Sequence, residues 1–272
     1  MRRVLPVRIL AIGFLGWLLA AAGADAQTLR VGGTGSALGL LQRLGGEFSA
    51  ASELRIDIVP SLGSGGAIRA LGDGKLELAV SARPLTSEEA ARGLDQVLVL
   101  KTAFVFATSH RNPNGFKSDD LAKIFADDQP TWADGSPMRL ILRPRSETDT
   151  ALLGELFPGM AGAIETLRRH PEVPTAATDQ DNVVLAERMP GSLIGTSATQ
   201  LATERPGLRW IELDGVAPVL ANFESGAYRF TKRLYVLTRS NGAPDVQRFV
   251  DFLRSPQGVK ALRAVETLVD GE

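Results

Sequence analysis

Three short stretches rich in glycine, serine and threonine decide the fold of this chain: Gly32-Gly33-Thr34-Gly35-Ser36, Leu62-Gly63-Ser64-Gly65-Gly66 and Arg143-Pro144-Arg145-Ser146-Glu147-Thr148. Each stands where a predicted strand runs into a predicted helix. Helix N-termini carry unpaired N–H groups and a partial positive charge, so an anion can rest there. Small residues allow close approach of the backbone, and hydroxyls add donors. Three such turns, with an arginine in the third, indicate a pocket for an oxyanion.

Predicted strands and helices alternate around these turns. The expected strands are Leu29–Val31, Arg55–Val59, Leu76–Val80, Val97–Leu100, Phe104–Ala107, Arg139–Leu142, Ser192–Thr196, Leu208–Leu213 and Arg233–Thr238. The expected helices cover Leu38–Phe48, Ala67–Leu71, Leu121–Phe125, Thr150–Phe157, Asp245–Leu253 and Pro256–Val265. Apolar residues recur every three or four positions in the first of these helices, as on one face of an amphipathic helix. This alternation of strands and helices is typical of an α/β protein.

Residues 1–26 are predicted to be a cleavable signal peptide. Three arginines precede the apolar run Ile9–Ala22, and Ala24-Asp25-Ala26 supplies the small residues that a signal peptidase reads. A membrane anchor is the alternative, but the apolar run is short for a span. We therefore expect the mature chain to begin at Gln27 and to be periplasmic.

Composition excludes several partners. The 272 residues contain no cysteine, so stability must come from a packed core without disulfides. The full chain has 30 basic and 31 acidic side chains. Cleavage of the predicted signal peptide would remove three basic side chains and one acidic side chain, so the mature net charge is near −3. That balance predicts no nucleic acid and no anionic membrane as partner, and any anion must be bound by local groups.

Catalytic and metal motifs are lacking in the sequence. The two histidines, His110 and His170, stand beside no nucleophile motif, and no cluster has metal-ligand spacing. The first glycine turn is neither a dinucleotide fingerprint nor a P-loop. The chain is therefore predicted to be no enzyme and to use no cofactor and no metal.

Seven segments occur in an order that resembles the periplasmic solute-binding proteins of the phosphate-binding type, which serve ATP-driven importers. They are Gly33–Ser36, Gly63–Gly66, Ser81–Leu85, Leu121–Phe125 with Trp132, Gly191–Gly195, Tyr228–Tyr235 and Ser255–Gly258. The resemblance covers essentially all of the chain after the signal peptide. It implies a type II periplasmic binding protein fold, with two lobes of mixed sheet flanked by helices and ligand in the cleft between them.

The resemblance also implies where the lobes divide. Lobe 1 is expected to contain 27–104 plus 229–272, and lobe 2 is expected to contain 105–228. The chain would cross between them near Ala103–Ala107 and again near Gly226–Lys232.

Ligand contacts are implied residue by residue. The expected set is Thr34, Ser36, the backbone N–H of Ala37, Ser64, Ser81, Arg143, Ser146, Glu147 and Thr148. Arginine stays charged and can form a two-pronged pair with an oxyanion. By contrast, Arg83 is expected to form a surface ion pair, Arg145 to point elsewhere, and Trp132, Tyr228 and Tyr235 to be structural.

The chain departs from the family at the acceptor for the proton of phosphate. The family has an aspartate directly after the serine that corresponds to Ser81, and this chain has Ala82 at that position. Glu147 or Asp149 could replace that acceptor, although Asp149 is more typical of a helix cap or first-turn acid. The alternative is that selectivity for phosphate has been lost, or that the site binds a different ligand.

The function implied is that of a monomeric binding protein that captures a small oxyanion, phosphate first, and delivers it to an ABC permease. One alternative is a sensory or accessory interaction protein with the same fold. Another is a different cargo, such as sulfate, molybdate or an organic phosphate.

Overall fold

The structure is a computed structural model that describes residues 28–60 and 62–271. The predicted signal peptide and its cleavage site lie outside the described residues. The strands are β1 (Thr28–Gly33), β2 (Arg55–Val59), β3 (Leu78–Ser81), β4 (Leu94–Thr108), β5 (Arg139–Leu140), β6 (Ser192–Ser197), β7 (Arg209–Trp210), β8 (Thr231–Arg239) and β9 (Thr267–Val269).

Eleven α-helices and two 3-10 turns connect these strands within the described ranges. They are η1 (Gly35–Ala37), α1 (Leu38–Ala51), α2 (Gly63–Gly72), α3 (Ser87–Ala91), η2 (Ser118–Asp120), α4 (Leu121–Ala126), α5 (Thr148–Leu156), α6 (Met160–Leu167), α7 (Asp179–Arg188), α8 (Ala198–Glu204), α9 (Leu220–Glu224), α10 (Pro244–Arg254) and α11 (Pro256–Arg263).

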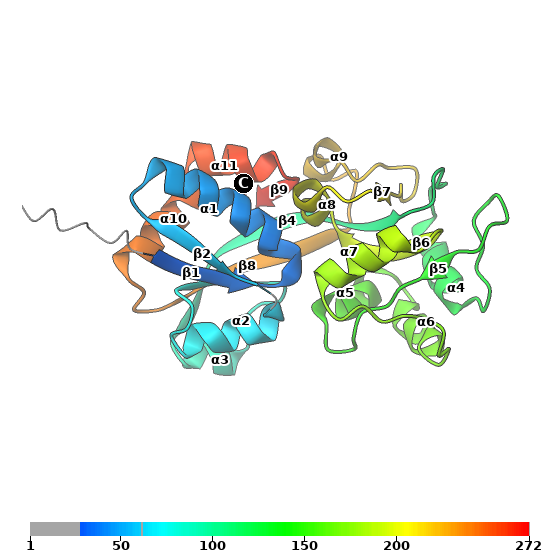
Figure 1. Cartoon of the computed structure of the whole chain (residues 1–272), viewed down its shortest axis with the longest axis horizontal. Helices are drawn as coiled ribbons and strands as arrows, with labels where there is room; N and C mark the ends of the chain where they lie inside the picture. The colour runs from blue at the N-terminus through cyan, green and yellow to red at the C-terminus, as the bar shows by residue number, and fades with distance from the viewer. Residues whose placement is uncertain (1–27, 61, 272) are drawn as a thin grey trace, which may run out of the picture.

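One long strand joins the two halves of the molecule (Figure 1). The sheet order is β2-β1-β3-β8-β4-β6-β5, with β7 and β9 also paired to β4. The N-terminal part of β4 pairs antiparallel with β8 as far as Ala103, and the next four residues pair antiparallel with β6. The two strands predicted at 97–100 and 104–107 are therefore one. No glycine or proline interrupts the segment, and its N-terminal and C-terminal parts pair with different strands.

The first half is built on β1, β2, β3, β8 and the N-terminal part of β4. Figure 1 shows α1, α10 and α11 on one side of these strands and α2 and α3 on the other. Leucine and phenylalanine side chains of α1, α10 and α11 pack on β1, β3 and β8, while α2 packs its Ile68 and Leu71 against Leu237. Strands β1 and β3 are parallel neighbours, so the loops that follow them lie at the same edge.

The second half is built on the C-terminal part of β4, β5, β6 and β7. Helices α4, α5 and α6 form a core with Phe104 and Phe106, and α7 packs Val183 and Ala186 near Ile194 on the other face. Tyr228 is buried and donates a hydrogen bond from Oη to the Phe104 carbonyl at 2.8 Å, which agrees with the predicted structural role. The cores thus separate into two groups, while the exact lobe boundaries stay a prediction.

Candidate functional site

The first glycine loop follows β1 and forms η1. Its Ser36 is buried, and the Ser36 backbone N–H donates to Asp179 Oδ2 at 3.1 Å. The Ala37 N–H donates to the Thr34 carbonyl at 3.0 Å, and the Thr34 and Ser36 hydroxyl oxygens lie 3.5 Å apart. The one backbone donor expected to meet a ligand, the Ala37 N–H, is therefore used within the loop, and the neighbouring Ser36 N–H holds a carboxylate of the chain itself.

Glycine at position 35 permits this approach of the second half. A Cβ there would lie 2.5 Å from Asp179 Oδ2 and 2.7 Å from Gln180 Oε1. The Gln180 side-chain amide also donates to the Gly35 carbonyl at 2.9 Å. Any side chain at this position would push the N-terminus of α7 away from the loop.

The second glycine loop is the first turn of α2. Gly63 begins the helix with φ of 64°, a conformation that favours glycine. Ser64 Oγ accepts a hydrogen bond from the Ala82 N–H at 2.9 Å. The Ser81 hydroxyl donates to the Arg83 carbonyl at 2.7 Å and accepts from the Arg83 N–H at 3.1 Å. Ser64 and Ser81 thus stabilise adjoining turns of the first half.

Arg143 lies on the chain that leaves β5, and it is only 6% exposed. Its Nη1 donates to the Ala176 carbonyl at 2.7 Å, and its Nη2 donates to Glu147 Oε2 at 3.1 Å. The same Nη2 lies 3.8 Å from Asp179 Oδ1, while Nε has no hydrogen-bond partner in the described chain. The predicted anion-binding arginine therefore points into the contact between the halves and faces carboxylates.

A small cavity of about 110 Å³ adjoins this arginine. It is lined by Gly35, Leu62, Gly63, Arg143, Glu147, Ala177, Thr178, Asp179 and Gln180. Both halves contribute to the lining, so the cavity lies in the cleft between them. We call it the arginine cavity.

A second cavity of about 330 Å³ also lies between the halves. Ser146, Glu147 and Thr148 line it from the second half, and Ala82 and Arg83 line it from the first. Glu147 lines both cavities, but Ser146 and Thr148 do not line the arginine cavity. The predicted site residues are therefore not gathered around one cavity, and five of them line neither: Thr34, Ser36, Ala37, Ser64 and Ser81.

Buried charges surround Arg143. Asp149 in the first turn of α5 lies 2.6 Å from Lys232 Nζ on β8, and both side chains are buried. Burial raises the pKa of Asp179, against the opposing effects of Lys232 and Arg143. Burial also raises the pKa of Glu147, which Arg143 opposes. The cluster holds two cations and three carboxylates, so its carboxyl groups outnumber its positive charges.

The flanking arginines lie as the sequence predicted. Arg83 pairs with Glu89 at 2.7 Å at the surface, and Arg145 pairs with Glu165 at 2.6 Å. Both arginines also line the second cavity, but neither lines the arginine cavity.

Asp179 and Lys232 are the members of the cluster that sequence analysis missed. The segment Thr178-Asp179-Gln180-Asp181 carries the signal of a capping box, which marks the start of a helix. Lys232 falls within a motif noted above. No local pattern, however, places either side chain beside Arg143.

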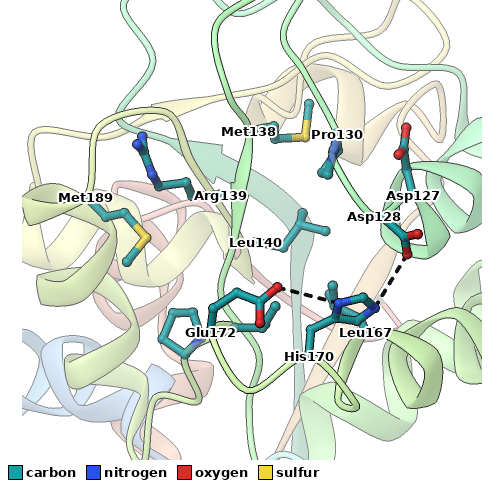
Figure 2. Close-up of a pocket in the computed structure, with 12 residues that line it drawn as sticks. Asp127, Asp128, Pro130, Met138, Arg139, Leu140, Leu167, His170, Glu172 and Met189 are labelled. Atoms are coloured by element: carbon teal, nitrogen blue, oxygen red, sulfur yellow. Dashed lines mark ion pairs between the residues drawn. The ribbon is translucent and has the colours of Figure 1, made fainter.

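A third hollow, of about 320 Å³, lies wholly within the second half (Figure 2). Met138, Leu140 and Leu167 form its apolar wall, and His170 stands between Asp128 and Glu172, 3.5 Å from each. It contains none of the predicted ligand residues. Its carboxylates also disfavour an anion.

Among residues 28–60 and 62–271, no group of three or more His, Cys, Asp or Glu side chains is arranged to hold a metal ion. Within the same ranges, no helix combines the length and the apolar character needed to cross a bilayer.

Comparisons with known proteins agree with this architecture. Residues 20–257 match the family described as PBP superfamily domain. A phosphate ABC transporter substrate-binding protein with bound phosphate from Clostridium perfringens has a TM-score of 0.75 at 15% identity, covering 89% of this chain and 99% of that one. An ABC-type phosphate transport receptor from Vibrio cholerae has a TM-score of 0.62 at 16% identity, covering 88% and 99%.

Other proteins share the fold. The effector-binding domain of QuiR in complex with shikimate has a TM-score of 0.54 at 12% identity, covering 84% of this chain and 95% of that one. No curated protein sequence matches the chain. The likenesses confirm the predicted α/β fold class, a mixed sheet flanked by helices of the type II periplasmic binding protein kind.

Proposed function

The chain belongs to the PBP superfamily, and we propose that it is an extracytoplasmic solute-binding protein that captures a small oxyanion, phosphate first, between its two halves. Its superfamily is one of binding proteins, in line with the prediction that it is not an enzyme. The proposal includes delivery of the anion to an ABC permease, and a monomeric state.

The position of Arg143 carries the proposal. This guanidinium is buried between the halves, faces the arginine cavity and keeps one N–H group without a partner in the described chain. A buried charge-assisted bond from arginine to an oxyanion contributes about 1.5–3 kcal/mol. An anion held there would touch both halves and would favour their closed arrangement by its differential affinity.

Glu147 is the better of the two acids expected to accept the proton of phosphate. Asp149 is committed to Lys232 and does not line the arginine cavity. Glu147 lines the cavity, and burial raises its pKa. An acid at this place accepts a hydrogen bond from hydrogen phosphate but repels fully deprotonated sulfate.

The test is a calorimetric titration of the purified protein with phosphate and with sulfate at neutral pH. We expect phosphate to bind at least about tenfold more tightly, a difference of about 1.4 kcal/mol. Glu147→Gln should abolish this preference. The matched control is Glu155→Gln, which changes the same charge on the second cavity. Equal or tighter binding of sulfate by the unmodified protein would contradict the proposal.

A sensory or accessory protein is the second candidate function. The observation that favours it is the internal pairing of Arg143, since Glu147 and Asp179 neutralise this cation without a ligand. Permease and ATPase genes beside the gene of this protein would favour transport. Their absence, together with failure to bind any anion of a panel, would favour the second candidate.

A further inference from the structure

We propose that the Asp179 carboxylate is a tethered anion: it occupies the anion position of the ligand-free protein, holds the two halves together, and must leave before an oxyanion can take its donors. Competition with an oxyanion rests on the proposed function, whereas closure of the two halves rests on the contacts of Asp179 alone.

Asp179 bridges two donors that come from different halves. Its Oδ2 accepts from the Ser36 N–H of the first half at 3.1 Å, and its Oδ1 lies 3.8 Å from Arg143 Nη2 of the second half. Both donors belong to residues, Ser36 and Arg143, that the resemblance assigns to the ligand. A carboxylate and an oxyanion compete for the same N–H donors, because each presents negatively charged acceptor oxygens.

The start of α7 does not explain this carboxylate. Thr178 and Asp181 form the complete capping box of the helix: Thr178 Oγ1 accepts from the Asp181 N–H, and Asp181 Oδ2 accepts from the Thr178 N–H. Asp179 is therefore free of the capping role. It is buried in the contact between the halves instead of facing solvent.

The charged groups that face Asp179 make joint occupancy unfavourable. Arg143 and Lys232 attract its carboxylate, whereas Glu147 and Asp149 already add negative charge. An oxyanion placed beside an ionised Asp179 would meet three carboxylates at close range. The favourable exchange is for the Asp179 carboxylate to leave these donors while the ligand takes the Ser36 N–H and the guanidinium.

The experiment compares Asp179→Asn with Asp181→Asn, which removes the same charge from the exposed side of the same helix. The chain has no cysteine, so Gln42→Cys on α1 and Val184→Cys on α7 can carry a pair of spin labels. Two quantities are measured for each variant: the label separation without ligand, and the affinity for inorganic phosphate.

Asp179→Asn is expected to shift the ligand-free labels to longer separations, and Asp181→Asn is expected to leave them unchanged. Phosphate should bind Asp179→Asn about fivefold or more tightly than the unmodified protein, since a competitor has been removed. Unchanged separations, or weaker phosphate binding by Asp179→Asn, would overturn the proposal. If no variant binds phosphate or sulfate, the proposed function fails, and the label separation alone decides whether Asp179 closes the protein.

A second variant tests the proposal independently, in case Asp179→Asn does not fold. Gly35→Ala places a Cβ against the Asp179 carboxylate from the other half, and Gly46→Ala, where a Cβ meets nothing within 4 Å, is its control. Longer label separations in Gly35→Ala but not in Gly46→Ala support the proposal. Equal separations in both would contradict it.

Discussion

Lys232 Nζ lies 2.6 Å from Asp149 Oδ1, and neither side chain has more than 7% of its surface exposed. Lys232 is the second residue of β8, and Asp149 is the second residue of α5. The pair therefore ties the strand that enters the first half to the helix that follows the third glycine-serine-threonine turn. The Lys232 ammonium has no partner with hydrogen-bond geometry among the described residues, so its contact with Asp149 is an ion pair.

Lys232→Met should destabilise the fold. It leaves the buried Asp149 carboxylate without its cation, and breaking a buried pair in this way costs about 3–5 kcal/mol. Urea denaturation measures the loss. Lys101→Met is the control, because the Lys101–Asp270 pair is partly exposed and should contribute less than about 1 kcal/mol.

Replacing both partners of the same pair should restore much of this stability. Lys232→Met combined with Asp149→Leu removes the unpaired charge altogether, and apolar replacements of buried pairs are often neutral. If Lys232→Met alone cost no more than Lys101→Met, the buried pair would have no special role.

Arg143→Ala is expected to weaken phosphate binding at least about tenfold, because the buried guanidinium is the cation of the proposed site. The same change leaves Glu147 and Asp179 without that cation, so the free energy of unfolding should also fall, by about 3 kcal/mol. Calorimetry and urea denaturation separate the two effects. Arg145→Ala, which loses only a surface pair, should change neither by much.

Tyr228→Phe should lower the free energy of unfolding by about 1 kcal/mol, because it removes the hydrogen bond to the buried Phe104 carbonyl. The control is Tyr235→Phe, since the Tyr235 hydroxyl has no hydrogen-bond partner among the described residues. Thermal unfolding of the two variants measures the difference. Equal loss in both would mean that the hydroxyl of Tyr228 contributes nothing beyond its ring.

The surface pair of Arg83 and Glu89 should give a measurable pH dependence. The hydrogen bond from Arg83 is the main cause that lowers the pKa of Glu89 to about 2. A lowered pKa means that the folded chain holds this proton less readily than the unfolded chain. The stabilisation is therefore present above the ordinary carboxyl range, near 4.5, and is lost as the pH falls toward 2.

Glu89→Gln tests this dependence. Because the pair is partly exposed, we expect the variant to be less stable by only about 0.5–1 kcal/mol at pH 7, with the difference shrinking as the pH falls to 3. Urea denaturation at a series of pH values measures it. Glu88→Gln removes a charge from a largely exposed pair and should show a smaller difference. A difference that grows on acidification would contradict the sign argued above.

Several elements could be predicted closely, because their signals are local. β2 has the predicted bounds, and α4 and α10 begin or end within one residue of them. The helices at 160–167 and 179–188 were missed. Contacts made by Asp179 could not be predicted, because they join residues 143 positions apart in the chain.

Local spacing determined that β1 ends in a small-residue loop, that Arg143 follows β5, and that strands alternate with helices. Those features depend on backbone freedom and hydrophobic periodicity within a few residues. Tertiary structure alone decided which charge meets Arg143. Packing of α7 against Gly35 places Asp179 at the amide of Ser36, a residue expected to contact a ligand, and packing of β8 beside α5 buries Lys232 with Asp149. Such pairs form between segments that are distant in the chain and that pack together away from water. A charge buried there without a partner would be costly, so each one is paired.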